Sequence, residues 1–320
     1  MTNKNEPIRH HYIPQFILRN FCFNDKNHLI YYDVQNKTVS VKETRDVFMS
    51  RLLYMDEVNH PVDRMRIERD FAEYEREVSG IINGSFLKDD EIIISKEEED
   101  KLKVFFALMG FRSKNTYDTF ETSISKDGKA LYSSYQEDGK LTDLWKRNLG
   151  LLVNCRSPED IDTHRRIDDP IKKFMQRDVF GYCGRHFSLV ECREPHEFII
   201  GDAFPTVIRG EGVIEMYAIL PISPNRVLLS VCEGAEWTPL DVRVLRERVL
   251  RKPNSANDGR IRILNTIINE EEIANINQHI ANSAKVGLAF RSKAVLTQFG
   301  IHSAFMDNEG INEEEVQKNA

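Results

Sequence analysis

The sequence predicts an α+β fold in which a mixed, largely antiparallel sheet packs against a helical middle region. Apolar residues recur at helical spacing between about residues 60 and 180, and short alternating runs lie before and after that region. Parallel pairing needs long crossovers, so the closely spaced C-terminal runs favour antiparallel pairing. We expect one composite domain over residues 1–306 and a flexible acidic tail over 307–320.

The first expected element of the sheet is a hairpin. Residues 28–34 and 38–43 alternate and are rich in β-branched and aromatic side chains, and the polar residues 35–37 form the turn between them. We expect this hairpin to share one sheet with the strands between residues 185 and 231. The helices of residues 64–125 should then pack on that sheet.

Two helices are marked most clearly in the middle region. In the first, five apolar residues step by three and four positions and so share one helical face: Ile67, Phe71, Tyr74, Val78 and Ile81. The second begins at Ser95, which forms a capping box with Glu98. Its expected inner face consists of Leu102, Phe105, Phe106 and Met109. Further helices are expected over 141–153 and 170–180.

Strand patterns resume after residue 185. The expected strands are 186–192, 197–202, 213–221, 225–232 and, last, 286–292. Thr238-Pro239 is typical of a helix start, and Asn269 with Glu272 predicts the cap of another helix.

Composition restricts the class of protein. The net charge of -7 argues against bulk attraction to nucleic-acid phosphates, although it leaves room for a local basic cleft. Five scattered cysteines without a Cys-x-x-Cys pair favour a reducing cytoplasm over a disulfide framework. No apolar stretch is long enough for a membrane span, and the N-terminus lacks the apolar core of a secretory signal. Dinucleotide, P-loop and α/β-hydrolase motifs do not occur.

The most distinctive segment opens the chain at His10-His11-Tyr12-Ile13-Pro14. Pro14 favours extended backbone before it and a helical turn after it, so both histidines should lie on extended chain at a helix entrance. Imidazoles there could bind a metal, transfer protons or contact an anion. Alternatively, one histidine packs against the helix and caps a backbone carbonyl while the other lies at the surface. Adjacent side chains on extended chain point to opposite sides, so one histidine at most should reach a given site.

This opening, HHYIPQFILRNF, resembles the start of the bacterial family called domain of unknown function 4238. Further resemblances follow in chain order, at residues 71–75, 105–112, 198–207 and 220–225 and at Asn277 with Ala281. Residues 201–205 depart from the family's Ser-Asp-Asn-Pro segment, losing a hydroxyl and an amide and gaining one residue. The resemblance implies the architecture of the family and no settled activity.

The matched segments together contain one set of polar residues: His10, His11, Arg19, Glu75, Arg112, Asp202, Asn225 and Asn277. Imidazoles with carboxylates suit a divalent metal such as Mg²⁺ or Mn²⁺, and arginines suit a phosphate. Each member also has a structural interpretation. Glu75 could form a salt bridge with Arg112, Asp202 could bond its own backbone at a turn, and Asn277 could cap or cross-link helices.

Two hypotheses for the function follow from this set. The first is a metal-assisted hydrolase, a nuclease or phosphodiesterase acting on nucleic acid or another phosphate-containing ligand. Its catalytic residues would be His10, His11, Glu75 and Asp202, of which His11, Glu75 and Asp202 would hold the metal. Arg19, Arg112, Asn225 and Asn277 would bind the substrate. The second is a non-catalytic ligand- or partner-binding module in which the set is a structural polar network. A defence or toxin-like context is expected by analogy alone.

Overall fold

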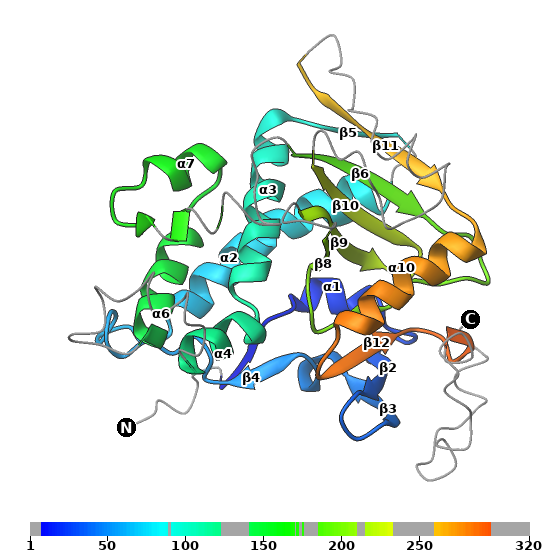
Figure 1. Ribbon diagram of the computed structural model, residues 1–320, viewed down its shortest axis with the longest axis horizontal. Helices are drawn as coiled ribbons and strands as arrows, with labels where there is room; N and C mark the ends of the chain where they lie inside the picture. The colour runs from blue at the N-terminus through cyan, green and yellow to red at the C-terminus, as the bar shows by residue number, and fades with distance from the viewer. Residues whose placement is uncertain are drawn as a thin grey trace.

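The computed structural model describes residues 8–88, 91–122, 141–169, 171–172, 175, 185–209, 215–232 and 259–295. Over these ranges the protein is an α+β fold with mixed, largely antiparallel sheets. In Figure 1 the middle helices gather on one side and most strands on the other. The fold class expected from the sequence is therefore confirmed.

The larger sheet has six strands in the order β5-β11-β6-β10-β9-β8. Their bounds are β5 Ile92–Ile94, β6 Arg185–Glu191, β8 Thr206–Arg209, β9 Glu215–Ser223, β10 Arg226–Cys232 and β11 Ile261–Ile267. Strands β6, β10, β9 and β8 pair antiparallel, as their close spacing predicted. Strand β11 was not predicted, and its parallel pairing with β6 makes the sheet mixed.

The smaller sheet has four strands in the order β3-β2-β12-β7 and combines both ends of the chain. Its strands are β2 His28–Asp33, β3 Thr38–Glu43, β7 Ile200–Gly201 and β12 Gly287–Phe290. The expectation of one shared sheet was therefore wrong: β2 pairs with β12, and only the two-residue β7 comes from the 185–231 region. The chain leaves this sheet through the bend at residues 202–205 before β8 begins.

The helical region follows the predicted pattern. It contains α2 Arg66–Ile81, a π-helical turn Ile82–Phe86, α3 Lys96–Phe111, α4 Lys114–Thr122, α6 Leu141–Leu152 and α7 Pro158–Thr163. The predicted apolar face of α2 is buried throughout. Ser95 and Glu98 form the expected capping box of α3. The helix predicted at 170–180 lies mostly outside the described residues, and the helix after Thr238 and the 307–320 tail lie wholly outside them.

Two short elements lead into the helical core. Strand β1 Arg9–His11 pairs antiparallel with β4 Met49–Arg51, and helix α1 Gln15–Arg19 follows it. Ile13, Ile17 and Leu18 are buried in a core shared with α2, α3 and α6. The opening motif therefore contributes apolar side chains to the core directly after β1.

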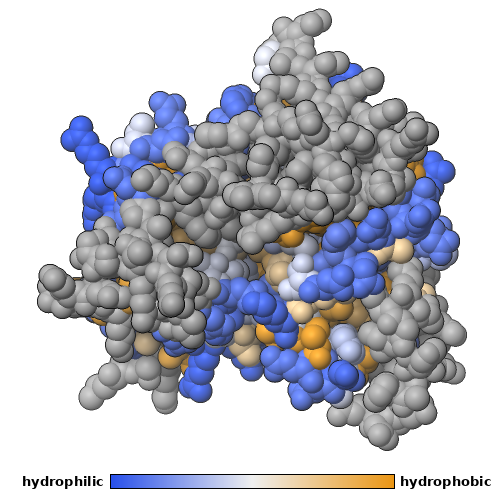
Figure 2. Space-filling view, in the orientation of Figure 1, coloured by the Kyte–Doolittle hydropathy of each residue, from blue (hydrophilic) through white to orange (hydrophobic). Residues whose placement is uncertain are grey.

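A second apolar core lies under α10 Glu270–Ser283, which Asn269 and Glu272 cap as predicted. Ile273, Ile276 and Ile280 are buried in it. Figure 2 shows hydrophilic side chains over the outer side of the region where Figure 1 places α10, as expected for an amphipathic helix. Across the parts of the chain that the structure describes, no helix combines the length and apolarity needed to cross a bilayer.

Candidate functional site

His10 is a buried member of β1. Its Nδ1 accepts a hydrogen bond from the backbone N–H of Tyr54 at 2.8 Å, and its ring stacks on that of Tyr54 with centroids 5.5 Å apart. A ring nitrogen that accepts a hydrogen bond carries no proton, so this geometry assigns a neutral imidazole. His10 therefore anchors the loop after β4. The structural interpretation of the histidine pair expected a bond to a backbone carbonyl, whereas Nδ1 accepts a bond from a backbone N–H.

His11 points to a different environment from its neighbour and is half-buried. Its Nε2 lies 2.9 Å from the side-chain nitrogen of Gln15, one helical turn along α1. Burial, reinforced by the Arg112 charge, lowers the pKa of His11 to about 4. The imidazole is neutral at pH 7, so it supplies no positive charge for a phosphate.

Arg112 follows the last residue of α3 and is buried, with 1 % of its surface exposed. Its Nη1 donates to Glu75 Oε1 at 2.6 Å, and its Nη2 donates to the carbonyl oxygen of His11. Its guanidinium carbon lies 4.2 Å from the centre of the Phe71 ring. Burial opposes the charge, yet Tyr54 and Glu75 hold the pKa of Arg112 above its usual value. The predicted Glu75–Arg112 pair thus exists and ties α2, α3 and β1 together.

Glu68 joins this cluster and was missed in the sequence. It lies on α2 seven residues before Glu75, which places both carboxylates on the same helical face. Burial raises the pKa of Glu68 to about 7, with Glu75 adding to the rise and Arg112 opposing it. Its position next to the buried Ile67, three residues before Phe71, was the signal that could have identified it.

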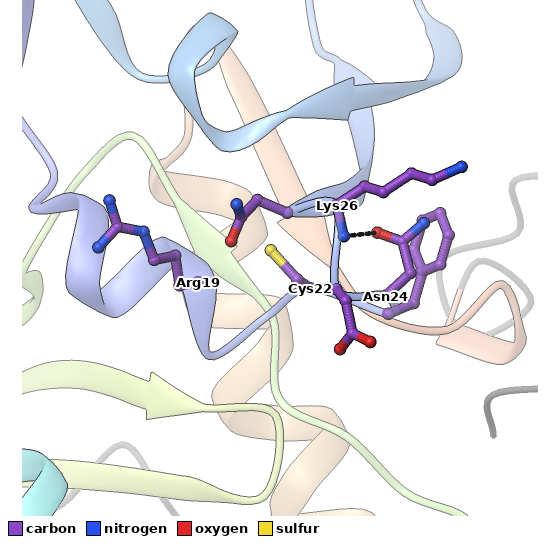
Figure 3. Close-up of a pocket in the computed structure, with 7 residues that line it drawn as sticks. Arg19, Cys22, Asn24 and Lys26 are labelled. Carbon is purple, nitrogen blue, oxygen red and sulfur yellow. Dashed lines mark hydrogen bonds between the residues drawn. The ribbon is translucent and has the colours of Figure 1, made fainter.

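Arg19 lines a surface pocket of about 720 Å³ beside α1 (Figure 3). The described residues of the lining are Arg19, Cys22, Phe23, Asn24, Asp25, Lys26 and Asn27. Figure 3 shows Arg19 on α1 and Cys22, Asn24 and Lys26 on the loop that follows, with the charged ends of Arg19 and Lys26 extending to opposite sides of the view. Asn24 Oδ1 holds this loop by accepting the backbone N–H groups of Lys26 and His28, both at 3.1 Å. The pocket contains a predicted substrate-binding residue, but the loop itself was not singled out in the sequence.

Hydrogen-bonding capacity for a ligand remains on Arg19 and Lys26. Arg19 makes one long contact, 3.5 Å from Nη2 to Gln15 Oε1, and neither cation forms an ion pair with any carboxylate of the described ranges. Burial raises the pKa of the Cys22 thiol to about 11, although Arg19 opposes this. The thiol stays protonated at neutral pH and is a weak nucleophile.

Asp202 follows β7 and lies next to the start of β12. Only 4 % of it is exposed, and its Oδ1 accepts the backbone N–H groups of Lys285, Val286 and Gly287 at 2.9, 2.9 and 3.0 Å. These bonds fasten the end of β7 to the start of β12. Among the described residues, no hydrogen bond or ion pair connects Asp202 with the Glu75–Arg112 pair.

The two asparagines of the set also serve local structure. Asn277 is fully buried on α10, where its Oδ1 accepts the N–H of Ile199 and its Nδ2 donates to the carbonyl of Glu197. Asn225 is exposed at the β9–β10 turn, with its Oδ1 2.7 Å from Ser223 Oγ. Neither belongs to the described lining of the Arg19 pocket.

The three predicted metal ligands, His11, Glu75 and Asp202, have separate hydrogen-bond or ion-pair partners among the described residues. Among the described residues, no three His, Cys, Asp or Glu side chains come together as ligands would. Glu75 is engaged by Arg112, and Asp202 by three backbone N–H groups in a different part of the fold.

Fold and site together define an α+β protein with a buried arginine network and a cationic surface pocket. The chain belongs to the family described as a protein of unknown function, DUF4238, whose model matches residues 9–294. The family expected from the sequence is thereby confirmed, and the matched span includes all eight residues of the predicted set. No curated protein matches the chain. No solved structure matches it.

Proposed function

We propose that this protein is a non-catalytic ligand-binding module whose Arg19 pocket takes a small phosphate-bearing ligand. The observation that carries the proposal is that Arg19 and Lys26 both line one pocket and have no carboxylate partner among the described residues. With Asp25, the charged side chains of the lining sum to one net positive charge. Arginine matches phosphate through its planar fork, and lysine adds a point charge.

The engagement of the other predicted residues supports a binding role over a catalytic one. Backbone groups form hydrogen bonds with the side chains of His10, Asp202 and Asn277. Glu75 holds the Arg112 charge. A general base or nucleophile must reach the substrate, and a side chain already saturated inside the fold is poorly placed to do so.

The metal-assisted hydrolase draws less support from the same contacts. Binding of one metal by His11, Glu75 and Asp202 would break the Glu75–Arg112 ion pair. It would also remove the three backbone N–H donors from Asp202. Each charge-assisted bond is worth about 1.5–3 kcal/mol, so the rearrangement is costly. The nuclease hypothesis nevertheless makes a different experimental prediction, and the same preparations test it.

Isothermal titration calorimetry on the full chain tests the proposal, with inorganic phosphate, adenosine monophosphate and a short single-stranded oligonucleotide as probes. We expect binding of at least one probe, weakened about tenfold (about 1.4 kcal/mol) by Arg19→Gln or Lys26→Gln. Arg51→Gln and Lys42→Gln are the matched controls, because both cations are exposed and lie outside the described pocket lining. Equal weakening of probe binding by pocket and control variants would mean that binding depends only on the overall charge of the protein, which would contradict the proposal.

A nuclease assay separates the two hypotheses. Single- and double-stranded DNA and RNA are incubated with the protein in Mg²⁺ or Mn²⁺, with EDTA as the blank. The binding module predicts no cleavage above that of a preparation of Asp202→Asn. Metal-dependent cleavage that Asp202→Asn abolishes while its fold is retained would replace the binding module with the hydrolase.

A further inference from the structure

Strand β3 forms the outer edge of the smaller sheet, where β2 is its partner among the described strands (Figure 1). Just beyond β3, the backbone N–H of Thr44 donates to the carbonyl of Asn27 at 3.0 Å. Hydrogen-bonded pairs alternate with non-bonded pairs along an antiparallel ladder, so Lys42, Ser40 and Thr38 turn their backbone groups toward β2. The backbone groups of the residues between them therefore point away from the sheet.

These outward-pointing backbone groups belong to Val39, Val41 and Glu43. None of them has a backbone hydrogen bond to another residue of the described ranges. The strand also lacks two common protections of a free edge, because its six residues contain no proline and its pairing with β2 continues without a bulge. The side chains of Val39 and Val41 are half-buried on one face of the strand, so an apolar strip accompanies the free edge.

We propose that β3 is an interaction surface for a second copy of this chain, which pairs its own β3 antiparallel to the first across a two-fold axis at Ser40. A two-fold axis makes such a contact self-complementary, because the same strand serves both copies. The two four-stranded sheets then join into one continuous sheet through main-chain hydrogen bonds. The proposal is independent of the Arg19 pocket and of its ligand.

The residues that this pairing brings together are complementary. With Ser40 opposite its own copy, Val39 of each chain lies opposite Val41 of the other. Their outward N–H and C=O groups then bond across the axis, and the half-buried valines form two cross-strand β-branched pairs. Lys37, exposed in the turn before β3, comes opposite Glu43 of the other chain. Two opposite-charge pairs therefore close the ends of the paired strands.

Charge also separates this register from its neighbours. An axis at Val41 would place Lys37 opposite Arg45 of the other chain, and an axis at Lys42 would place two lysines opposite one another. An axis at Val39 would lose the opposite-charge pair. Lys42 therefore acts against misaligned pairing, whereas with the axis at Ser40 it lies opposite a threonine, and like charges are kept apart.

Sedimentation equilibrium of the full chain between about 5 and 500 µM tests the proposal, because an edge of six residues forms a weak, concentration-dependent contact. We expect wild type to approach twice the monomer mass at the upper end. Lys37→Glu and Glu43→Lys each place like charges opposite one another twice, and each should raise the dissociation constant at least about fivefold. Glu73→Lys makes the same charge change at an exposed position of α2 and should dissociate like wild type.

An equal mixture of the Lys37→Glu and Glu43→Lys chains is the decisive sample. A dimer with one chain of each kind regains two opposite-charge pairs, so the mixture should associate about as tightly as wild type although neither variant does so alone. A wild type that stays monomeric throughout, or a mixture that associates no better than its components, would overturn the proposal.

Amide hydrogen exchange of wild type locates the contact and decides alone if a variant fails to fold. The N–H groups of Val39 and Val41 should exchange several-fold more slowly as the protein concentration rises, while that of Ser40, already directed at β2, should change less. A dimer in which Val39 and Val41 exchange unchanged would place the contact elsewhere. Protection of both at every concentration would show that the chain covers its own edge. Either result would refute pairing through β3.

Discussion

Replacing Asp202 by alanine tests most directly whether the predicted catalytic set is structural. The change leaves three backbone N–H groups without their acceptor. That of Gly287 is buried, and leaving it unpaired should cost about 1–3 kcal/mol. Those of Lys285 and Val286 are partly accessible, so water can replace the carboxylate at about 0.5–1 kcal/mol each. The sum is roughly 2–5 kcal/mol of unfolding free energy, or about 3–8 °C in melting temperature for a chain of 320 residues.

The magnitude is checked by urea unfolding and calorimetry of Asp202→Ala, with two comparisons. Asp202→Asn keeps an acceptor oxygen and should cost about half as much, because only the charge is lost. Asp33→Ala removes an exposed carboxylate that also accepts two backbone N–H groups, from Gln35 and Asn36, and should cost less than about 1 kcal/mol. A normal or increased stability of Asp202→Ala would refute the structural assignment and return Asp202 to the candidates for catalysis.

Two further predictions concern the interior cluster. Glu75→Ala should lower the unfolding free energy by about 2–4 kcal/mol, because it leaves the buried Arg112 charge with the His11 carbonyl as its remaining hydrogen-bond acceptor. The control Glu73→Ala should change the unfolding free energy by less than about 0.5 kcal/mol. Urea unfolding measures both variants, and equal effects would contradict a structural role for Glu75. His11, whose pKa falls from 6.5 to about 4 on folding, should make wild type lose stability as the pH drops below 6.5. His11→Gln should flatten that slope in melts between about pH 4 and 6.5, and an unchanged slope would place the effect on other groups.

Local signals in the sequence predicted the helices well because helix formation depends on near neighbours. The face of α2 from Ile67 to Ile81 and the capping boxes at Ser95 and Asn269 are set by spacings of three and four residues. The Glu75–Arg112 pair was foreseen as one structural option, because both residues come from helices expected to pack together. Its backbone partner, the carbonyl of His11, carries no side-chain signature and could not be foreseen.

Strand partners were harder to predict because pairing joins residues far apart in the chain. The alternation in the hairpin identifies β2 and β3 but does not show that β12, more than 250 residues later, lies beside β2. For the same reason Asp202 was expected beside Glu75. Its acceptor role became visible only once β7 and β12 were adjacent, since the three N–H groups belong to the segment that β12 begins.

The opening motif acts as a joint between parts of the fold. His10 holds the backbone of Tyr54, the His11 carbonyl holds Arg112 at the end of α3, and Asn20 Nδ2 donates to the Ile222 carbonyl in β9 at 2.8 Å. An unusual polar motif can therefore be demanded by architecture alone, and its histidines need no ligand to explain them. One charged side chain next to this joint is not explained in this way. Arg19 forms no ion pair with any described residue, so ligand chemistry should be sought at this position first.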